Sequence, residues 1–406
     1  MNDVRDILNI KIESPYWDEA YAKALSEPAV PEWMTEAYIR ALHEEKGVLP
    51  RRLDTILSVL PHAVAVPELC LLAKTLYHII GTKKSFSEAF TEFELPKAPD
   101  TVENTLGYDC FAIFPVLAHI IPTWNELKER DIPDEVLTAS LHWADTIFVE
   151  WSERAGKTIF HEEEFKLYKF AVYVNNLTVG RLRFEIHENS SRPVRIFKNK
   201  KNGTFCPLMD GAMIHKSGHI LGSMSCKDEE GSYPADFVET EDAFEGYPLD
   251  ENTRLAIKKR VRLLKSEWEQ VYASGDTVLK VHIPHGGAIT PEVCKDSYKR
   301  GKELFARCFP EYKFKCFLIC CWTLSPVLKE ILPPESNIIA FQNSYVVYPM
   351  KNPAMDVFLY VYNIEANSLD DIAVAELPEN NTLQRGVKQK TLEGKYIHQF
   401  GGYMPM

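Results

Sequence analysis

The chain has 406 residues, of which 45% are hydrophobic and 26% are charged, values ordinary for a globular protein. Its formal net charge of −12 argues against a nucleic acid or an anionic membrane as partner, because both need a basic face. We find no run of 18 apolar residues and no basic, apolar leader, so we expect a soluble, cytoplasmic protein. A chain of this length is expected to form two domains.

The nine cysteines are an odd number and stand mostly in apolar surroundings, which is typical of free, buried thiols in a reducing compartment. Cys316, Cys320 and Cys321 could suggest a metal site. Adjacent residues of a strand point to opposite faces, however, and no second Cys or His pair has zinc spacing. We therefore expect no metal.

The first part of the chain, to about residue 157, shows only helical patterns. Prolines near the first turn mark the starts of several helices. The expected helices span 16–26, 31–45, 67–81, 102–124 and 133–154, with Pro115 and Pro122 as kinks or breaks in the fourth. We find no chemical motif among them. We expect a helical domain that packs on a catalytic one.

Strand patterns take over after Ala155, Gly156 and Lys157, so we place the domain boundary there, giving domains 1–156 and 157–406. Residues 161–175 fit either a helix or a strand. Residues 178–187 alternate as a strand does, and 213–221 predict a hairpin turning at 216–219. We interpret 239–246 as an acidic loop and 263–272 as a short amphipathic helix.

The stretch 276–348 holds the clearest order of elements. Leu279, Val281 and Ile283 alternate with polar residues, which predicts a strand, and two glycines follow it. Thr290 and Pro291 then open a helix that we expect at 290–309. Residues 314–322 are apolar on both faces, which is typical of a central strand. A short helix at 325–332 and strands at 338–348 and 357–362 complete the pattern.

This order resembles the acyl-CoA-binding half of the GNAT N-acetyltransferase fold. The segments His-Ile-Pro-His-Gly-Gly (282–287), Cys-Trp-Thr-Leu-Ser-Pro (321–326), Ser-Asn-Ile (336–338) and Gly-Arg-Leu-Arg-Phe-Glu (180–185) are similar to a bacterial two-domain family. That family joins an all-helical N-acyltransferase N-terminal domain to a GNAT-like C-terminal domain, and the resemblance covers nearly the whole chain. It implies an α+β protein, helical first and then α/β with a mixed, mostly antiparallel sheet.

The resemblance also implies an acyltransferase. Its co-substrate would be acyl-CoA or acetyl-CoA, and its acceptor an amine of a small molecule or peptide. The superfamily's pyrophosphate loop aligns here only as Ile283-x-x-Gly286-x-Ala288, without its polar first residue. Neither the acyl length, the acceptor nor the oligomeric state can be inferred from the sequence.

A helix N-terminus preceded by glycines is a physical site for the coenzyme's pyrophosphate, because free N–H groups converge there. We expect coenzyme contacts from the loop and the first helical turns. The residues are Ile283, Gly286, Gly287, Ala288, Ile289, Thr290 and Lys295. The alternative is a plain tight turn before a solvated helix face.

Amide formation from a thioester needs a base for the amine, and histidine suits this role near neutral pH. His282 and His285 lie where the thioester would bind, and Glu185 is a third candidate. His282 could instead be a packed, structural histidine. An N–H near Ile283 would stabilise the oxyanion.

Many GNAT enzymes place a tyrosine acid on the short helix after the buried strand, but residues 326–332 contain none. Ser325, Asn337 and Tyr345 are the substitutes in that neighbourhood. Two other classes stay open. Cys294, in the first turn of a helix, could be an activated nucleophile, or the protein could be a GNAT-like module that binds a ligand or partner without turnover.

Overall fold

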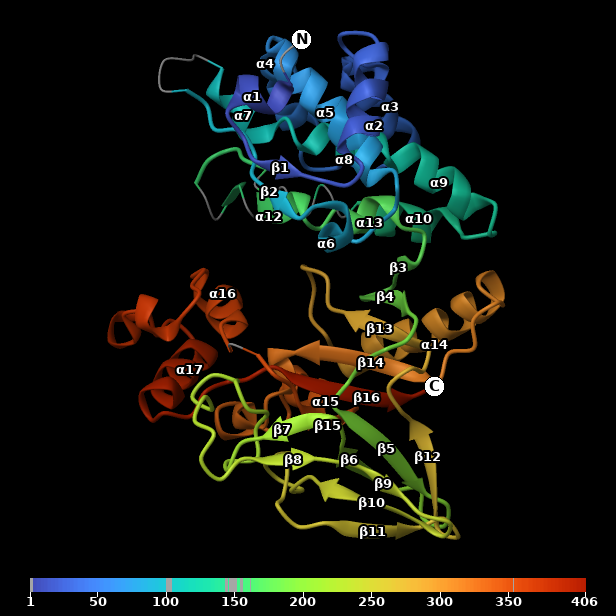
Figure 1. Cartoon of the computed structure of the whole chain (residues 1–406), viewed down its shortest axis with the longest axis vertical. Helices are drawn as coiled ribbons and strands as arrows, with labels where there is room; N and C mark the ends of the chain where they lie inside the picture. Colours follow the sequence, from blue (N-terminus) through green and yellow to red (C-terminus); the bar gives the residue numbers. More distant parts are fainter. Residues whose placement is uncertain are drawn as a thin grey trace. The chain divides into compact units, whose positions relative to one another are not determined.

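A computed structural model describes residues 3–99, 104–142, 145, 152–153, 156–160, 162–352 and 354–406. The chain folds into two compact units, Met1–Val179 and Gly180–Met406. Helices dominate the first unit, drawn in blue to green in Figure 1, and sheets dominate the second. The protein is thus α+β, as expected. The domain boundary that we placed after residue 156 stays a prediction.

The first unit is built from short helices. They are α1 Val4–Leu8, α2 Trp17–Ser26, η1 Glu32–Met34, α3 Glu36–Lys46, α4 Leu53–Val64, α5 Pro67–Ile80, α6 Phe86–Ala89, α7 Thr105–Cys110, α8 Ile113–Ala118, α9 Ile120–Lys128, α10 Asp134–Leu141, α12 Glu162–Phe165 and α13 Lys169–Val172. Short strands β1 Ile12–Glu13 and β2 Glu92–Phe93 pair with each other, and β3 Asn176–Val179 ends the unit.

The helices expected at 16–26 and 67–81 are confirmed as α2 and α5. The helix expected at 31–45 is split in two, because Thr35 is extended and caps α3 with its side chain. The helix expected at 102–124 is described from residue 104 as three helices, α7, α8 and α9; the breaks expected at Pro115 and Pro122 are wrong, since Pro115 lies inside α8 and Pro122 inside α9. The helix expected at 133–154 is described as α10, and most of the residues beyond it lie outside the described ranges.

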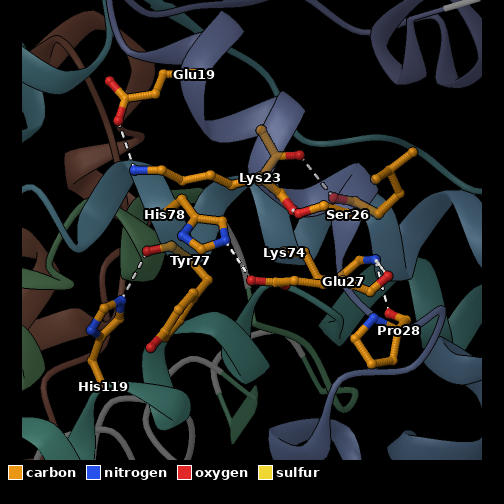
Figure 2. A network of polar contacts seen from close by, with 11 residues as sticks. Glu19, Lys23, Ser26, Glu27, Pro28, Lys74, Tyr77, His78 and His119 are labelled. Carbon is orange, nitrogen blue, oxygen red and sulfur yellow. Dashed lines mark hydrogen bonds and ion pairs between the residues drawn. The ribbon is translucent and has the colours of Figure 1, made fainter.

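A buried lysine joins α2 to α5 (Figure 2). Lys74, in α5, donates hydrogen bonds to the carbonyl oxygens of Glu27 (3.4 Å) and Pro28 (2.9 Å), just after α2. His78, one turn along α5, contacts the Glu27 carboxylate at 2.7 Å. Burial lowers the pKa of Lys74. These contacts satisfy a buried cation and fix the end of α2, which is a structural role.

In the described part of the chain, no single helix has both the length and the hydropathy of a membrane span. Within that part, only helices α4 and α5 taken together have this length and hydropathy, and the two helices are bent by 113° relative to each other.

The main sheet of the second unit has the order β15-β16-β14-β13-β4. Its strands are β4 Leu182–His187, β13 Val278–His282, β14 Cys316–Cys321, β15 Val346–Pro349 and β16 Phe400–Pro405. β13 and β14 run parallel and the other neighbours run antiparallel. A mixed, mostly antiparallel sheet was expected, but β16, between β14 and β15, was not.

A second, antiparallel sheet has the order β11-β10-β6-β5-β12, and β9 pairs with β10. Its strands are β5 Val194–Asn199, β6 Phe205–Met209, β9 Val238–Glu239, β10 Ala243–Pro248, β11 Val261–Leu264 and β12 Trp268–Tyr272; β7 Ala212–Ile214 pairs with β8 Tyr233–Ala235 beside it. Ile196 and Tyr272 of this sheet share one apolar cluster with Leu318 and Tyr403 of the main sheet. The core of the unit therefore lies between the two sheets.

Helix α14, Pro291–Cys308, packs on the opposite face of the main sheet. It confirms the helix expected at 290–309. Thr290 caps it by accepting a hydrogen bond from the N–H of Val293. A Cβ built at Gly301 would lie 2.8 Å from the ring of Phe184 in β4. The glycine therefore lets the helix approach the sheet closely.

The remaining helices of this unit follow β14. They are η2 Trp322–Leu324, η3 Pro326–Glu330, α15 Asn337–Asn343, α16 Asp356–Tyr362, η4 Leu369–Asp371, η5 Val374–Glu376 and α17 Thr382–Leu392. The strand expected at 357–362 is wrong, because Val357 and Phe358 pack as helix α16 in a cluster with Val387 of α17. The strand expected at 338–348 is half wrong, since α15 precedes β15; Ser336 caps that helix.

Two expectations near β10 and β11 are also wrong. The acidic segment 239–246 is not one loop, because β9 ends at Glu239, β10 begins at Ala243, and Glu245 pairs with Arg262 across the strands. Residues 263–272 are not a helix but the end of β11, a turn and β12. The turn closes through the hydrogen bond from the N–H of Glu267 to the carbonyl of Leu264 (2.9 Å). Their apolar residues repeat with a helix-like spacing only because the two strands are so close in sequence.

Candidate functional site

The parallel strands β13 and β14 pair over a short distance. Leu279 lies opposite Phe317, and Lys280 lies opposite Leu318. The two strands continue to His282 and to Cys321 without a further registered pair. Their carboxyl ends are therefore not joined by a ladder, and such ends are where ligands bind in sheets with parallel strands.

The loop after β13 is fixed by one arginine that we did not predict. Arg181 donates hydrogen bonds to the carbonyl oxygens of Pro284 (2.8 Å), Gly286 (3.4 Å) and Gly287 (2.6 Å). The φ angle of Gly286 is +121°, which favours glycine. The guanidinium thus gathers three carbonyl groups of the loop on its own side. Arg181 stands in the segment 180–185 that carried the resemblance, which was the available signal.

The N–H groups of the same loop have no acceptor in the described part of the chain. This holds for Gly286, Gly287, Ala288 and Ile289, which lead to the helix cap Thr290. Gly286, Gly287 and Ala288 are exposed. Unpaired N–H groups before the N-terminus of an 18-residue helix form a physical anion site.

A pocket of about 400 Å³ lies beside this loop. Its wall along α14 carries three lysines spaced by four and three residues, Lys295, Lys299 and Lys302. Its apolar lining comes from the loop, β14, α15 and β16, through Ile289, Phe317, Phe341 and Met404. The volume suits a small-molecule ligand, and the cations suit an anionic one. Of the predicted residues, Ile289 and Lys295 line this pocket.

Two of the predicted catalytic residues meet. His282 Nε2 lies 2.8 Å from Glu185 Oε2, and Lys280 Nζ lies 3.7 Å from the same oxygen. The antiparallel register of β4 and β13 places Glu185 opposite Lys280 and two pairs away from His282, on the same face of the sheet. Glu185 is buried and His282 is partly exposed. A buried carboxylate can orient an imidazole and stabilise its protonated form.

The other predicted residues are more dispersed. Ile283 follows β13 directly, and His285 is exposed in the glycine loop. Asn337 is exposed in the first turn of α15.

A pair of tyrosines lies next to the pocket. The hydroxyl groups of Tyr298, in α14, and Tyr345, before β15, are hydrogen-bonded to each other. Burial raises the pKa of both above the ordinary tyrosine value. Both therefore keep their protons at neutral pH. Tyr345 was one of our substitutes for the missing acid, whereas Tyr298 was not predicted.

The nine cysteines are free. Burial raises the pKa of the Cys294 thiol, although nearby Arg181 lowers it in part. A raised pKa is the opposite of what an activated nucleophile needs, which removes support from that alternative. Among the described residues, no three His, Cys, Asp or Glu side chains are arranged to hold a metal ion.

Comparison with known proteins gives a family match over more than half of the chain. The family model described as GNAT-like C-terminal domain matches residues 177–404. A search of curated proteins gave no match.

Several solved structures share the fold over almost the whole chain. One is an acyltransferase in complex with decanoyl-CoA and teicoplanin, 17% identical, covering 99% of this chain and 98% of that one, with a TM-score of 0.61. Another is a mutant acyltransferase in complex with octanoyl-CoA, also at 17% identity, with the same coverage and TM-score. A third, in complex with CoA and 10C-teicoplanin, has 17% identity, the same coverage and a TM-score of 0.60.

Proposed function

The chain belongs to the GNAT-like C-terminal domain family, and on this premise we propose that it is an acyl-CoA-dependent acyltransferase that acylates an amine. The observation that carries the proposal is the glycine loop. Its unpaired N–H groups open beside a pocket that three lysines line, and the loop follows directly after His282, which pairs with Glu185.

The coenzyme is recognised through its phosphates. Gly286, Gly287, Ala288 and Ile289 donate N–H groups to the pyrophosphate at the start of α14, where the helix dipole adds to the attraction. Lys295, Lys299 and Lys302 neutralise the remaining phosphate charge along the helix. Arg181 contributes indirectly, because it holds the carbonyl oxygens of the loop away from the anion.

His282 acts as the base. It removes a proton from the acceptor amine as the nitrogen attacks the thioester carbon, and Glu185 stabilises the imidazolium that forms. An N–H near Ile283 stabilises the oxyanion of the tetrahedral intermediate. His285 and Asn337 are exposed and serve, in this proposal, as secondary contacts to the substrates.

Loss of the thiol completes the reaction. The C–S bond breaks while the C–N bond is kept, and the thiolate accepts a proton. Tyr345 and Tyr298, whose hydroxyl groups are hydrogen-bonded, relay that proton to the sulfur, and the imidazolium of His282 returns the proton of the amine to the pair through solvent, so that the net reaction moves one proton from the amine to the thiolate. A coenzyme thiol has a pKa near that of cysteine, so weak acid help is sufficient.

The relatives of the same fold suggest probes for both substrates. They bind decanoyl-CoA, octanoyl-CoA and teicoplanin. We therefore propose a medium-length acyl donor and an amine on a small molecule or peptide as acceptor.

The test is a mixture of the protein with acetyl-CoA or decanoyl-CoA and amine probes that include teicoplanin and a set of short peptides. Release of free thiol together with a product heavier by one acyl group is the expected result. Tight coenzyme binding without thiol release for every probe would favour the non-catalytic alternative.

A further inference from the structure

A second, smaller cavity of the GNAT-like unit is separate from the coenzyme pocket. Its volume is about 70 Å³, and no residue lines both cavities. Leu324, Gln342, Tyr345 and Val347 are its buried lining. Arg254 and Lys329 supply its cationic part.

A carboxylate lies near one of the two cations: the pKa of Asp250 is lowered by the hydrogen bonds that it accepts from Thr253 and Asn252 and also by the charge of Arg254. In the described ranges neither Arg254 nor Lys329 forms an ion pair, and burial together with the nearby Arg254 lowers the pKa of Lys329. Glu330, next to Lys329 in sequence, pairs instead with Lys390 (3.0 Å) and Lys395 (2.8 Å). Asp250, four residues before Arg254, accepts hydrogen bonds from the N–H groups of Asn252 (3.0 Å) and Thr253 (2.8 Å). The Asp250 carboxylate thus stabilises the turn that follows it in the chain. Two like charges facing one small cavity are stabilised by a bound anion.

A buried amide supplies an acceptor. Gln342 is 3% exposed and lines the cavity, and its Oε1 accepts no hydrogen bond. Its Nε2 donates to the carbonyl oxygens of Ser325 (2.8 Å) and Thr323 (3.5 Å). A flipped amide would bring Oε1 against those two carbonyl groups, so its orientation is fixed. A buried acceptor without a partner is costly, and a ligand that donates a hydrogen bond to it would bind more tightly.

We propose that this cavity binds a phosphate group, either free phosphate or a phosphate monoester. The volume is about five times the 10–15 Å³ that one water needs, which matches five heavy atoms. The oxygen anions face Arg254 and Lys329, and a proton retained on the phosphate is donated to Gln342 Oε1. Phosphate esters lose their second proton near pH 6, so this form is present in neutral solution.

The proposal goes beyond the acyl transfer, because no residue of the glycine loop or of α14 lines this cavity. The tyrosine pair connects the two cavities. Tyr345 lines the small cavity, and its hydroxyl partner Tyr298 lines the coenzyme pocket. A phosphate bound beside Tyr345 therefore lies next to the group that we propose as the acid.

The experiment is calorimetric titration of the whole protein with inorganic phosphate and with methyl phosphate, at pH 6.5 and constant ionic strength. In the presence of saturating dephospho-coenzyme A, which fills the phosphate sites of the coenzyme pocket, we expect saturable binding with one site. Arg254→Gln and Lys329→Gln should each weaken it at least tenfold, whereas Lys302→Gln, in the coenzyme pocket, should leave it unchanged. Sulfate, which carries no proton at this pH, should bind about tenfold more weakly than phosphate.

A titration in the presence of coenzyme A identifies the source of the phosphate. If phosphate and coenzyme A bind at the same time, the cavity binds a separate phosphate. If coenzyme A displaces phosphate and dephospho-coenzyme A does not, the cavity binds the ribose phosphate of the coenzyme. Either result supports the proposal. Absence of saturable phosphate binding, or equal affinity in wild type and in the folded Arg254→Gln and Lys329→Gln variants, would overturn it.

Discussion

At the scale of single residues, the chemistry that we propose depends on how a buried carboxylate positions a histidine. Glu185 reaches His282 at 2.8 Å and Lys280 at 3.7 Å, so one carboxylate faces two bases. A packed, structural histidine would make the same contact. The contact therefore fits both a catalytic and a structural role of His282. Kinetic and stability measurements on a His282 variant distinguish the two roles.

Replacement of His282 by Gln should lower kcat by about 10² to 10⁴, the usual contribution of a general base. Coenzyme affinity should stay unchanged, because the phosphates bind at the loop and not at this side chain. The measurement is steady-state kinetics together with calorimetry of coenzyme binding. Unfolding in urea is the control, since a large loss of stability with unchanged kcat would show a structural histidine.

A second residue-scale prediction concerns acid stability. His119 lies 2.9 Å from the carbonyl oxygen of Tyr77 and stacks on its ring at 4.3 Å (Figure 2). Burial lowers the pKa of His119 to about 4. Between pH 6.5 and 4 the unfolded state therefore binds more protons than the folded state, so stability falls as the pH falls through this window.

The measurement is urea unfolding of wild type and His119→Gln at pH 7 and at pH 5. The wild type should lose more stability than the variant between the two values, because Gln has no proton to gain. An equal loss in both proteins would contradict the role of His119.

At the scale of elements, the glycine loop and α14 form the part that the sequence predicted best. The sequence signals here are local: the cap Thr290, Pro291 in the first turn and the preceding glycines. Such signals act within one short segment, so they do not depend on contacts with distant residues. Arg181 could not be predicted in the same way, since it meets the loop only through the approach of β4 to β13. The tyrosine pair depends likewise on the packing of α14 near α15.

Elements whose state depends on packing were predicted worst. Residues 357–362 are rich in β-branched and aromatic residues, yet they form α16, because contact with α17 outweighs their intrinsic preference. Two short strands at 261–272 imitate a helical period. In both places the deciding contacts come from residues distant in sequence.

The loop prediction is tested by Gly287→Glu. A Cβ at Gly287 would meet nothing within 4 Å, and its backbone does not have a positive φ, so the fold should tolerate the change. A carboxylate there would repel the pyrophosphate, and coenzyme affinity should fall by at least 100-fold. Calorimetry with coenzyme A measures this. Gly287→Ala is the matched control and should retain binding; equal affinity for Glu and Ala variants would remove the loop from the site.

The packing of α14 is tested by Gly301→Ala. Alanine is the better helix former, so an exposed position would gain about 0.5–1 kcal/mol. Here the new methyl group would lie 2.8 Å from the Phe184 ring, and overpacking of this kind costs about 1–3 kcal/mol. We expect a net loss of stability in urea unfolding. A more stable variant would show that the helix has room to move from the sheet.

At the scale of the whole molecule, the α+β class and the order of its two parts could be predicted from the sequence. Helical periods end and strand periods begin along the chain, and the resemblance to the GNAT-like family added the mixed sheet. The second sheet, β5 to β12, was largely missed. Charged side chains such as Glu245 and Arg262 lie on the outer face of its short strands. In the sequence, segments with such charges resemble solvated loops.

The account depends most directly on whether this chain binds acyl-CoA beside the glycine loop. The decisive measurement is the melting temperature with coenzyme A, acetyl-CoA and decanoyl-CoA, for wild type and for Gly287→Glu. A ligand at about 100 times its dissociation constant stabilises the folded state by about 2.7 kcal/mol, a visible rise. We predict a rise for wild type, largest with the preferred acyl form, and none for the variant. No rise with any of the three, or the same rise in the variant, would contradict the account.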